Sequence, residues 1–357
     1  MSKVQGYAAL NAKSPLTFFE FERRALRPHD VKIDILYCGV CHSDLHKVRN
    51  EWKNTMYPVV PGHEIVGRIV DLGPQTSLFK IGELVAVGCL VDACRLCTSC
   101  LEGLEQYCEK QSIFTYDSID PVDRSATRGG YSSQIIVDEK FTLKIPTAFK
   151  EKDLPAVAPL LCAGITTYSP LRHWHVGKNS RVGVVGLGGL GHMAVQLACA
   201  MGAEVAVFTS SKNKVQDAKK LGAHHVVLSS EKKEMELFID SLDFIINTVS
   251  ATHSLDHFIQ LLKRNGTMCM VGLPESCYPS FDTAQLIFRR KSLAGSLIGG
   301  IRETQEMLEF CAQHHILPEI EIIAIQKINE AFERMLKNDV KYRFVIDMAS
   351  LHSKKPI

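Results

Sequence analysis

Long apolar segments are absent from this sequence of 357 residues. No apolar run approaches the roughly 20 residues that a membrane-spanning helix needs. The N-terminal stretch MSKVQGYAALNAKS also lacks the apolar core of a secretory signal peptide. We therefore predict a cytoplasmic protein that has no membrane partner.

Clusters of like charge are also missing. The chain has 41 Lys and Arg against 39 Asp and Glu, which gives a formal net charge of +2. A protein that binds nucleic acid needs a concentrated set of basic side chains to neutralise phosphates, and the sequence has no such set. We therefore predict no nucleic-acid partner.

The pattern of apolar residues changes near Pro155. Before it, short runs such as Val31–Leu36 and Ile65–Val70 are separated by Gly, Pro and Asp, which is typical of β-strands. After it, strands such as Arg181–Val185 alternate with helical segments such as His192–Met201, which indicates a parallel sheet flanked by helices. The length suits about two domains, and we predict an α/β fold with a β-rich first half.

Cysteine is abundant, with 12 residues in the chain. A reducing cytoplasm disfavours disulfides, so clustered thiols are more often metal ligands or catalytic groups. Cys94, Cys97, Cys100 and Cys108 follow the pattern C-x2-C-x2-C-x7-C, which lets one loop place four thiolates around a tetrahedral ion. Because four sulfur ligands leave no open position, the pattern predicts a structural zinc. An iron–sulfur cluster and a thiol switch remain alternatives, although the last spacing and the lack of a following proline disfavour the cluster.

Six further cysteines stand mostly among apolar neighbours: Cys38, Cys89, Cys199, Cys269, Cys277 and Cys311. Buried thiols of this kind act as small hydrophobic side chains. We therefore expect them to be buried and to take no part in chemistry.

A second group of metal-binding side chains is dispersed along the sequence. The segments Cys41–His46 and Gly62-His63-Glu64 place a thiol, imidazoles and carboxylates near predicted strand ends. A catalytic zinc takes three protein ligands and keeps one position open, and two cysteines with one histidine are a known set. Cys162, where the β-rich half meets the α/β half, is the candidate third ligand. Its position alone does not distinguish a ligand from an ordinary buried cysteine.

A glycine-rich loop follows the first predicted strand of the α/β half. Gly186, Gly188 and Gly191 form the pattern G-x-G-x-x-G between this strand and a helix, with Gly189 and Leu190 completing the loop. In a dinucleotide site the first glycine permits a tight turn, the second lets the backbone approach the pyrophosphate, and the third allows close helix packing. The loop therefore predicts a dinucleotide cofactor.

The next strand distinguishes NAD(H) from NADP(H). An NAD(H) site places an acid at the end of this strand to hold the ribose hydroxyls, but here the chain continues as Ser210-Ser211-Lys212. Small hydroxyls and lysines would accept a 2′-phosphate, which an acid would repel. We therefore predict NADP(H). The alternative, that Lys212 and Lys214 are only the solvated start of a helix, remains open.

The stretch Gly62-His63-Glu64-x2-Gly67-x5-Gly73 resembles the signature of zinc alcohol dehydrogenases. The whole chain resembles the medium-chain zinc-dependent dehydrogenases. Within them it is most similar to the cinnamyl alcohol dehydrogenase group, in particular to the bacterial NADPH-dependent broad-range aldehyde reductases. The stretches that carry this closer match extend over nearly the full length: Tyr37–His46, Gly103–Cys108, Ala158–Leu171 and Lys341–Asp347.

The resemblance implies a particular division of the chain. Residues 1–155 would form a GroES-like, β-rich catalytic domain that carries the structural-zinc loop. Residues 156–297 would form a Rossmann NADP-binding domain with a doubly wound sheet, and residues 298–357 would return to the catalytic domain. Likeness to the family also implies a homodimer or a homotetramer.

The resemblance assigns metal-binding roles to individual residues. Cys41, His63 and Cys162 match the ligands of a catalytic zinc, and Glu64 matches a carboxylate that can approach the metal. Asp44 matches the residue that orients the histidine ligand. Together with the four-cysteine loop, these matches imply two zinc ions per chain.

Other matches concern proton transfer, cofactor and substrate. Ser43 and His46 match the family's proton relay. His42 and Arg343 match groups near the cofactor pyrophosphate, and Thr166 matches a threonine that packs against the nicotinamide. Three residues resemble positions that line the substrate pocket, although ordinary packing would explain them equally well: Trp52, Leu297 and Ile298.

The activity that the resemblance implies is reversible hydride transfer between NADPH and an aromatic or medium aliphatic aldehyde. A polyol dehydrogenase of the same fold is one alternative, which the four-cysteine loop and the NADP(H) pattern disfavour. A non-catalytic zinc protein, such as a redox sensor, is another. A sensor would need neither the Ser43–His46 relay nor the nucleotide loop.

Overall fold

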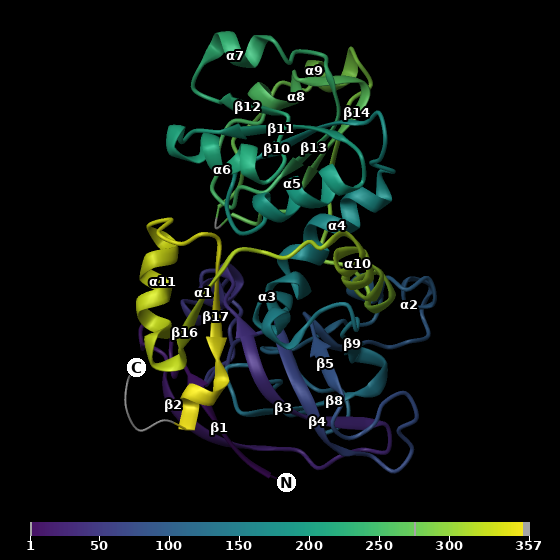
Figure 1. Ribbon diagram of the computed structural model, residues 1–357, viewed down its shortest axis with the longest axis vertical. Helices are drawn as coiled ribbons and strands as arrows, with labels where there is room; N and C mark the ends of the chain where they lie inside the picture. The colour runs from purple at the N-terminus through teal and green to yellow at the C-terminus, as the bar shows by residue number, and fades with distance from the viewer. Residues whose placement is uncertain (1, 275, 353–357) are drawn as a thin grey trace. The chain divides into compact units, whose positions relative to one another are not determined.

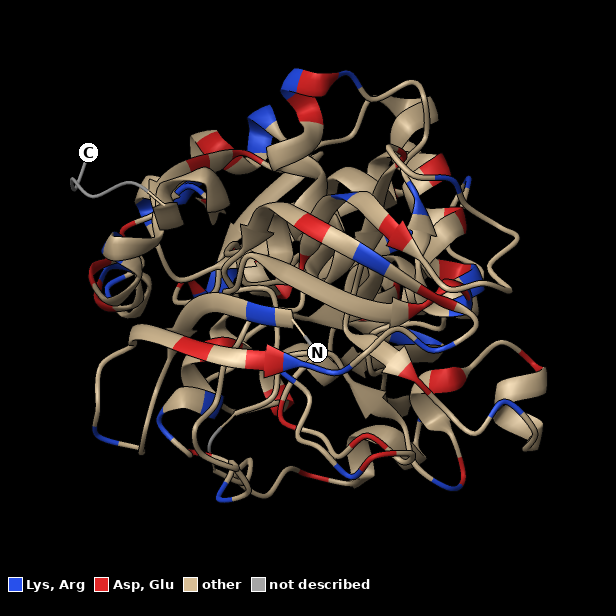
Figure 2. Cartoon of the chain, turned by 90° about the horizontal axis from the view of Figure 1, so that it is seen from below, with Lys and Arg blue, Asp and Glu red and all other residues tan. Residues whose placement is uncertain are grey.

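The computed structural model describes residues 2–274 and 276–352 (Figure 1). Acidic and basic residues are interspersed along the chain, as Figure 2 shows. Among the described residues, no single helix is long and apolar enough to cross a membrane. The segments Glu151–Leu161 and Ala163–His173 reach that length and composition only when taken together, and most of their residues are buried within the protein.

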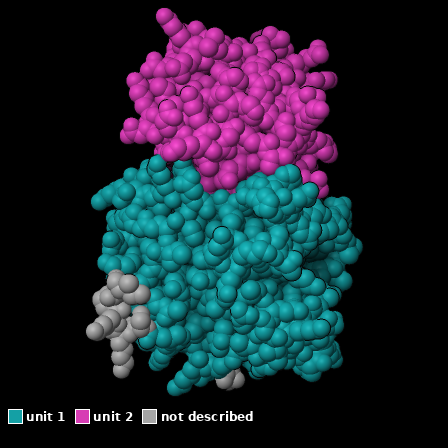
Figure 3. Space-filling view, viewed as in Figure 1, with its two compact units in different colours: residues 1–162, 299–357 teal, residues 163–298 magenta. Residues whose placement is uncertain are grey.

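The chain divides into two compact units (Figure 3). Unit 1 comprises residues 1–162 and 299–357, and unit 2 comprises residues 163–298. The divisions therefore fall after Cys162 and Ile298, compared with the expected ends at 155 and 297. Unit 1 is built from both ends of the chain, and unit 2 from its middle.

Unit 2 contains a parallel six-stranded sheet in the order β12-β11-β10-β13-β14-β15. Its strands are β10 (Arg181–Val185), β11 (Glu204–Thr209), β12 (His225–Leu228), β13 (Leu242–Asn247), β14 (Leu262–Met270) and β15 (Ser292–Gly295). Counted along the chain within this unit, the order is 3-2-1-4-5-6, which is that of a doubly wound nucleotide-binding sheet. The predicted α/β topology is confirmed.

Helices alternate with these strands along the chain. They are α4 (Ala163–His173), α5 (Gly191–Ala200), η5 (Lys212–Lys214), α6 (Val215–Lys220), α7 (Lys232–Glu236), α8 (Asp256–Ile259) and α9 (Ala284–Ile287). Every residue of β10 after Arg181 is buried, as is typical of a central parallel strand that is covered on both faces. Phe208, Phe238 and Phe258 belong to the apolar core beside the sheet. The end of β10 is therefore a rigid base for the glycine loop.

Unit 1 is built on a seven-stranded sheet in the order β16-β17-β3-β4-β5-β9, with β8 paired to β3. Its strands are β3 (Asp30–Gly39), β4 (Ile65–Leu72), β5 (Leu84–Val87), β8 (Gln134–Asp138), β9 (Leu143–Lys144), β16 (Ile320–Ala324) and β17 (Arg343–Asp347). Two small sheets pair β1 (Ser2–Ala8) with β2 (Thr17–Arg23), and β6 (Leu90–Asp92) with β7 (Ile113–Phe114). The β-rich first half is confirmed.

The C-terminal segment returns to the centre of the unit 1 sheet. β17 pairs antiparallel with β3, so that Val345 lies opposite Gly39 and the start of β17 lies close to the end of β3. The helices of unit 1 are α1 (His42–Val48), α2 (Thr98–Leu101), η1 (Glu105–Tyr107), η2 (Glu139–Phe141), η3 (Glu151–Asp153), α3 (Leu154–Val157), η4 (Ala158–Leu161), α10 (Ile301–His314), η6 (Ile325–Lys327), α11 (Ile328–Leu336) and η7 (Met348–His352).

The cysteines outside the two candidate metal sites differ in burial. Cys38, Cys269 and Cys311 are buried as expected, and Cys89 and Cys199 are partly buried. The expectation was wrong for Cys277, which is exposed. It lies in an irregular loop between β14 and α9, where neither a sheet face nor a helix face covers it.

Candidate active site and metal centres

The four loop cysteines come together in unit 1. The Sγ atoms of Cys94, Cys97, Cys100 and Cys108 all lie within 4.8 Å of one another. The distance is 3.9 Å between Cys94 and Cys100 and 4.0 Å between Cys97 and Cys108. Four sulfur ligands at about 2.3 Å from a zinc ion would lie about 3.8 Å apart. The loop therefore fits a tetrahedral, closed zinc site.

Cys41, His63, Glu64 and Cys162 form a second cluster, whose four ligand atoms also lie within 4.8 Å of one another. Cys41 is the N-cap of α1, His63 and Glu64 precede β4, and Cys162 follows η4. The two Sγ atoms are 3.8 Å apart, as expected for two ligands of one tetrahedral metal. Cys162, which its sequence position left undecided, thus lies beside the other candidate ligands.

At least one thiol in each cluster, that of Cys108 in the first and that of Cys41 in the second, has a lowered pKa and so loses its proton readily. Burial raises the pKa of the Cys108 thiol, but backbone N–H groups, first that of Cys94, lower it to about 6. The pKa of the Cys41 thiol lies well below its ordinary value because Cys162 and His63 hydrogen-bond to it, which outweighs its burial. The thiolate is the form of cysteine that binds a metal, so these environments suit metal ligands.

Asp44 holds the second cluster in position. Its buried carboxylate accepts hydrogen bonds from the backbone N–H groups of Cys41 at 2.9 Å and Gly62 at 3.0 Å, and from the Tyr131 hydroxyl at 3.0 Å. It also lies 3.2 Å from Nδ1 of His63, which leaves Nε2 as the nitrogen for a metal. Gly62 has φ of +102°, and a Cβ there would approach Tyr131 within 2.6 Å, so this turn requires glycine.

Glu64 is paired with a buried cation. Its Oε1 contacts Nη2 of Arg343, which also donates to the carbonyl oxygen of Val40 at 2.9 Å. Burial raises the pKa of the Glu64 carboxyl to about 8, although the charge of Arg343 opposes that rise. Glu64 Oε2 is buried and has no hydrogen-bond partner among the described residues. An unpaired oxygen beside two thiols fits a carboxylate that can turn toward a metal.

Ser43 and His46 lie on α1, which begins at this cluster. Ser43 Oγ is 3.6 Å from Cys41 Sγ. His46 is buried, and its Nδ1 contacts the carboxylate of Glu51. The indole ring of Trp52 lies against His46 with 5.2 Å between ring centroids. The helix therefore places a hydroxyl next to the metal cluster and an imidazole–carboxylate pair one turn further on.

The glycines of the nucleotide loop in unit 2 have the geometry that their roles require. Gly186, directly after β10, has φ of +90°, which disfavours any side chain. A Cβ on Gly188 would meet no atom within 4 Å, which leaves the backbone open to a pyrophosphate. A Cβ on Gly191, the first residue of α5, would lie 2.1 Å from the Gly186 carbonyl oxygen. Gly189 and Leu190 complete the loop, and Leu190 is the N-cap of α5.

The end of β11 adds a lysine to this loop. Lys214 Nζ donates to the carbonyl oxygen of Leu187 at 2.8 Å, and burial lowers the pKa of Lys214. Ser211 is partly buried, whereas Ser210 and Lys212 are exposed. Lys214 is therefore the lysine that contacts the glycine loop, whereas the sequence pattern had pointed to Lys212.

Comparison with known protein families gives a match in the β-rich part of the chain and another in the nucleotide-loop part. Residues 27–147 match the family model of the alcohol dehydrogenase GroES-like domain, and residues 189–313 match that of zinc-binding dehydrogenase. Aldehyde reductase YahK of Escherichia coli is 55% identical over 98% of this chain and 99% of its own length.

Two solved structures share the whole fold. A cinnamyl alcohol dehydrogenase of Sorghum bicolor matches with a TM-score of 0.94 and 41% identity over 98% of each chain. The CAD of Helicobacter pylori complexed with NADP(H) matches with a TM-score of 0.90 and 43% identity, over 97% of this chain and 98% of its own.

The chain belongs to the zinc-dependent alcohol dehydrogenase family. The predicted resemblance is thereby confirmed, as are a GroES-like fold for the β-rich part and a zinc-binding dehydrogenase fold for the doubly wound part. As a member of this family, the protein is an oxidoreductase.

In this zinc-dependent dehydrogenase, the other residues that were predicted to bind cofactor or substrate are divided between the two units. His42 is exposed, and its ring centroid lies 6.3 Å from that of His46. Thr166 is buried in α4 of unit 2. At the end of the same unit, Ile298 is buried and Leu297 is exposed. The roles expected for them in binding cofactor and substrate stay predictions.

One residue of the candidate site was missed from the sequence, Glu51, and Lys214 was not distinguished from Lys212. Glu51 lies five positions after His46, and only the turn that ends α1 brings the two together, so no periodic pattern marks them. Lys214 lies three positions after Ser211, the N-cap of the short helix η5. Side chains three apart share one side of a helical turn, so this spacing could have favoured Lys214 over Lys212.

Proposed function

We propose that this dehydrogenase transfers hydride reversibly between NADP(H) and an aromatic or medium aliphatic aldehyde. The observation that carries the proposal is the cluster of Cys41, His63 and Cys162, which has Ser43 beside it and His46 on the same helix. Relatives named as an aldehyde reductase and a cinnamyl alcohol dehydrogenase support the class of substrate.

Each side chain of the cluster has a distinct part in the proposed reaction. When bound, zinc would act as a Lewis acid on the substrate oxygen, and NADPH would supply the hydride. Cys41, His63 and Cys162 would hold the metal and leave one position for substrate. Asp44 fixes the orientation of the His63 ring, and Glu64 supplies a carboxylate that can approach the metal.

The proton would move along α1. Because His63 and Cys162 are buried, a substrate oxygen held at the metal would depend on side chains to pass a proton to bulk water. Ser43 would give its proton to the substrate oxygen as the alcohol forms, and His46 would restore it. Glu51, in contact with Nδ1 of His46, orients the ring so that its other nitrogen would be available to Ser43's relay.

The four-cysteine loop would bind a second zinc ion without taking part in catalysis. Cys94, Cys97, Cys100 and Cys108 fill all four tetrahedral positions, so no substrate can reach the metal. The proposed content is therefore two zinc ions per chain, one catalytic and one structural. A homodimer or homotetramer and a cytoplasmic location remain part of the proposal.

The preference for NADP(H) rests on the end of β11. No acid stands there, and the Lys214 ammonium group lies at the glycine loop with Ser211 at the start of the same turn. A 2′-phosphate would find a cation and hydroxyl donors at this place. The relative complexed with NADP(H) supports the same cofactor. His42, Thr166 and Arg343 are proposed to contact other parts of it.

Lysine variants test this cofactor proposal. Lys214→Ala should raise the KM for NADPH by about tenfold, since a phosphate–ammonium contact would be lost. The KM for NADH should change little. Lys212→Ala is the matched control, because it removes the same charge from an exposed position two residues away. Steady-state kinetics with benzaldehyde measure the KM of both variants. A preference of the wild-type enzyme for NADH would contradict the NADP(H) proposal.

A further inference from the structure

Unit 1 contains a cavity of about 460 Å³ that none of the proposed zinc or relay residues lines. This volume lies within the range of about 300 to 1,000 Å³ that is typical of small-molecule sites. Part of the lining is apolar and buried: Phe21, Ile113, Ile135 and Val137. The polar part of the lining comes mainly from the segment between β2 and β3, from the loop before β8, and from the start of the four-cysteine loop.

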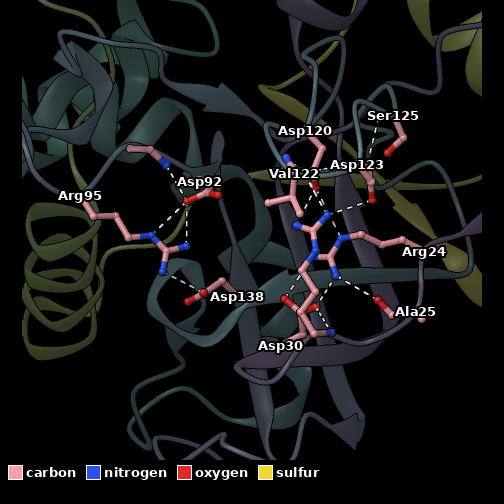
Figure 4. A network of polar contacts seen from close by, with 12 residues as sticks. Arg24, Ala25, Asp30, Asp92, Arg95, Asp120, Val122, Asp123, Ser125 and Asp138 are labelled. Carbon is pink, nitrogen blue, oxygen red and sulfur yellow. Dashed lines mark hydrogen bonds and ion pairs between the residues drawn. The ribbon is translucent and has the colours of Figure 1, made fainter.

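Most charged side chains of the cavity are paired with one another (Figure 4). The pairs are Arg24 with Asp30 and Asp120, Arg27 with Asp120 and Asp123, and Arg95 with Asp92 and Asp138. Each of these carboxylates also accepts a hydrogen bond from a backbone N–H group: Arg27 to Asp30, Val122 to Asp120, Ser125 to Asp123, Ala93 to Asp92 and Lys140 to Asp138. These acids are therefore fully engaged.

Two other arginines of the lining have no carboxylate partner among the described residues. Arg23 donates to neutral acceptors, which are the carbonyl oxygens of Gln134 at 3.1 Å, Arg128 at 2.6 Å and Gly129 at 3.1 Å, and the Ser132 hydroxyl at 3.0 Å. Arg128 is less engaged than Arg23: its Nε is buried and has no hydrogen-bond partner among the described residues.

The two guanidinium groups share one aromatic ring. The Cζ atoms of Arg23 and Arg128 each lie 5.0 Å from the centroid of Phe21. Burial, with the nearby charges of Arg128 and Arg24, lowers the pKa of Arg23 to about 9, and burial lowers the pKa of Arg128. A single ring compensates two cations only weakly, and Glu22, the remaining acid of the lining, is exposed and pairs with neither arginine among the described residues.

We propose that this cavity binds a small organic carboxylate. Its carboxylate group pairs with the terminal guanidinium nitrogens of Arg128, which contact no carboxylate among the described residues, in the forked geometry that arginine forms with carboxylates. Its apolar body lies on Phe21 and the aliphatic side chains beside it. Arg23 adds positive charge, but its own donors are occupied. None of the residues of the cluster of Cys41, His63 and Cys162 lines this site, and the proposal does not depend on the proposed reaction.

Isothermal titration calorimetry of the zinc-loaded enzyme with benzoate tests this proposal, with benzamide as the uncharged probe of the same shape. We expect one benzoate per chain and no comparable binding of benzamide. Arg128→Met, which keeps an apolar stem, should weaken benzoate binding by about tenfold. Arg124→Met is the matched control, because it removes a charge from an exposed residue of the same loop that does not line the cavity.

Turnover of benzaldehyde shows whether the variants are folded, and it should match the wild type in both. Three results would overturn the proposal. The first is equal benzoate binding by wild type and Arg128→Met, together with competition between benzoate and aldehyde, which would place the ligand at the zinc. The second is equal binding of benzamide, and the third is no binding of benzoate at millimolar concentration.

Discussion

Ser43 is the residue on which the proposed proton transfer depends. Its hydroxyl lies 3.6 Å from Cys41 Sγ, but it is not one of the clustered ligands. Ser43→Ala should therefore lower kcat by about a hundredfold or more, the usual size of general acid–base catalysis, while the zinc content stays unchanged. Steady-state kinetics and metal analysis of the purified variant measure the two quantities.

The Ser43→Thr variant is the control for this prediction, because it keeps the hydroxyl and should retain most of the activity. Loss of zinc in Ser43→Ala would show a structural role instead. Unchanged turnover would show that the proton takes another path.

At the scale of single residues, the sequence predicted what short spacing determines. The four cysteines from Cys94 to Cys108 lie close together along the chain, so their pattern alone indicated a shared ion. Cys162 lies 121 residues from Cys41, and no local pattern could decide whether the fold brings them together. Glu51 was missed because its contact with His46 depends on the turn at the end of α1.

The glycine loop and α5 form an element whose packing can be tested without cofactor. A Cβ at position 191 would lie 2.1 Å from the backbone oxygen of Gly186, whereas one at position 188 would meet nothing within 4 Å. Gly191→Ala should therefore lower the free energy of unfolding by about 1 to 3 kcal/mol, because the loop or the helix must shift. Gly188→Ala should leave the stability nearly unchanged but weaken binding of NADPH.

Urea denaturation of the cofactor-free variants and fluorescence titration with NADPH distinguish the two effects. If Gly188→Ala bound NADPH as tightly as the wild type, the backbone at this position would not approach the cofactor. Equal stability of the Gly191→Ala variant and the wild type would contradict the close packing of α5.

Glu139 ties the short helix η2 to a neighbouring loop. Its buried carboxylate accepts hydrogen bonds from the backbone N–H groups of Ser77 and Leu78, both at 2.8 Å. Burial raises the pKa of Glu139, but the two N–H groups and His29 lower it by a larger amount. The pKa of Glu139 therefore lies below its ordinary value. Glu139→Gln should therefore destabilise the protein by about 2 kcal/mol near neutral pH, where the carboxylate is charged.

The effect of Glu139 should depend on pH in one direction. A carboxyl with a lowered native pKa stabilises the fold above its unfolded pKa, which is about 4.3, and loses that contribution as pH falls through the lower native value. The difference in unfolding free energy between wild type and Glu139→Gln should therefore shrink below about pH 4. Glu83→Gln, at an exposed position, is the control. A difference that stays constant with pH would contradict this account.

At the scale of elements, β10 was predicted because its apolar run and the glycines that follow it are local signals. β10 and α5 match the expected strand and helix within one residue. The pairing of β17 with β3 was not predictable in this way, since it joins segments about 300 residues apart and depends on the assembled sheet. That pairing brings Arg343 to Glu64.

At the scale of the whole molecule, the change of pattern near Pro155 correctly predicted a β-rich part followed by a parallel sheet flanked by helices. The return of the C-terminal segment to the first part came only from the family resemblance, because its short strands and helices resemble those of either unit. Both sets of candidate metal ligands lie in unit 1, and the nucleotide loop lies in unit 2. The proposed reaction needs both.

Zinc content measured together with NADPH oxidation on benzaldehyde tests the central claim most directly. The account predicts two zinc ions per chain and steady turnover. Cys162→Ser should lose one zinc and the turnover together, because it removes a ligand of the open site and leaves the four-cysteine loop intact. One zinc ion per wild-type chain with no turnover would contradict the account and favour a non-catalytic zinc protein.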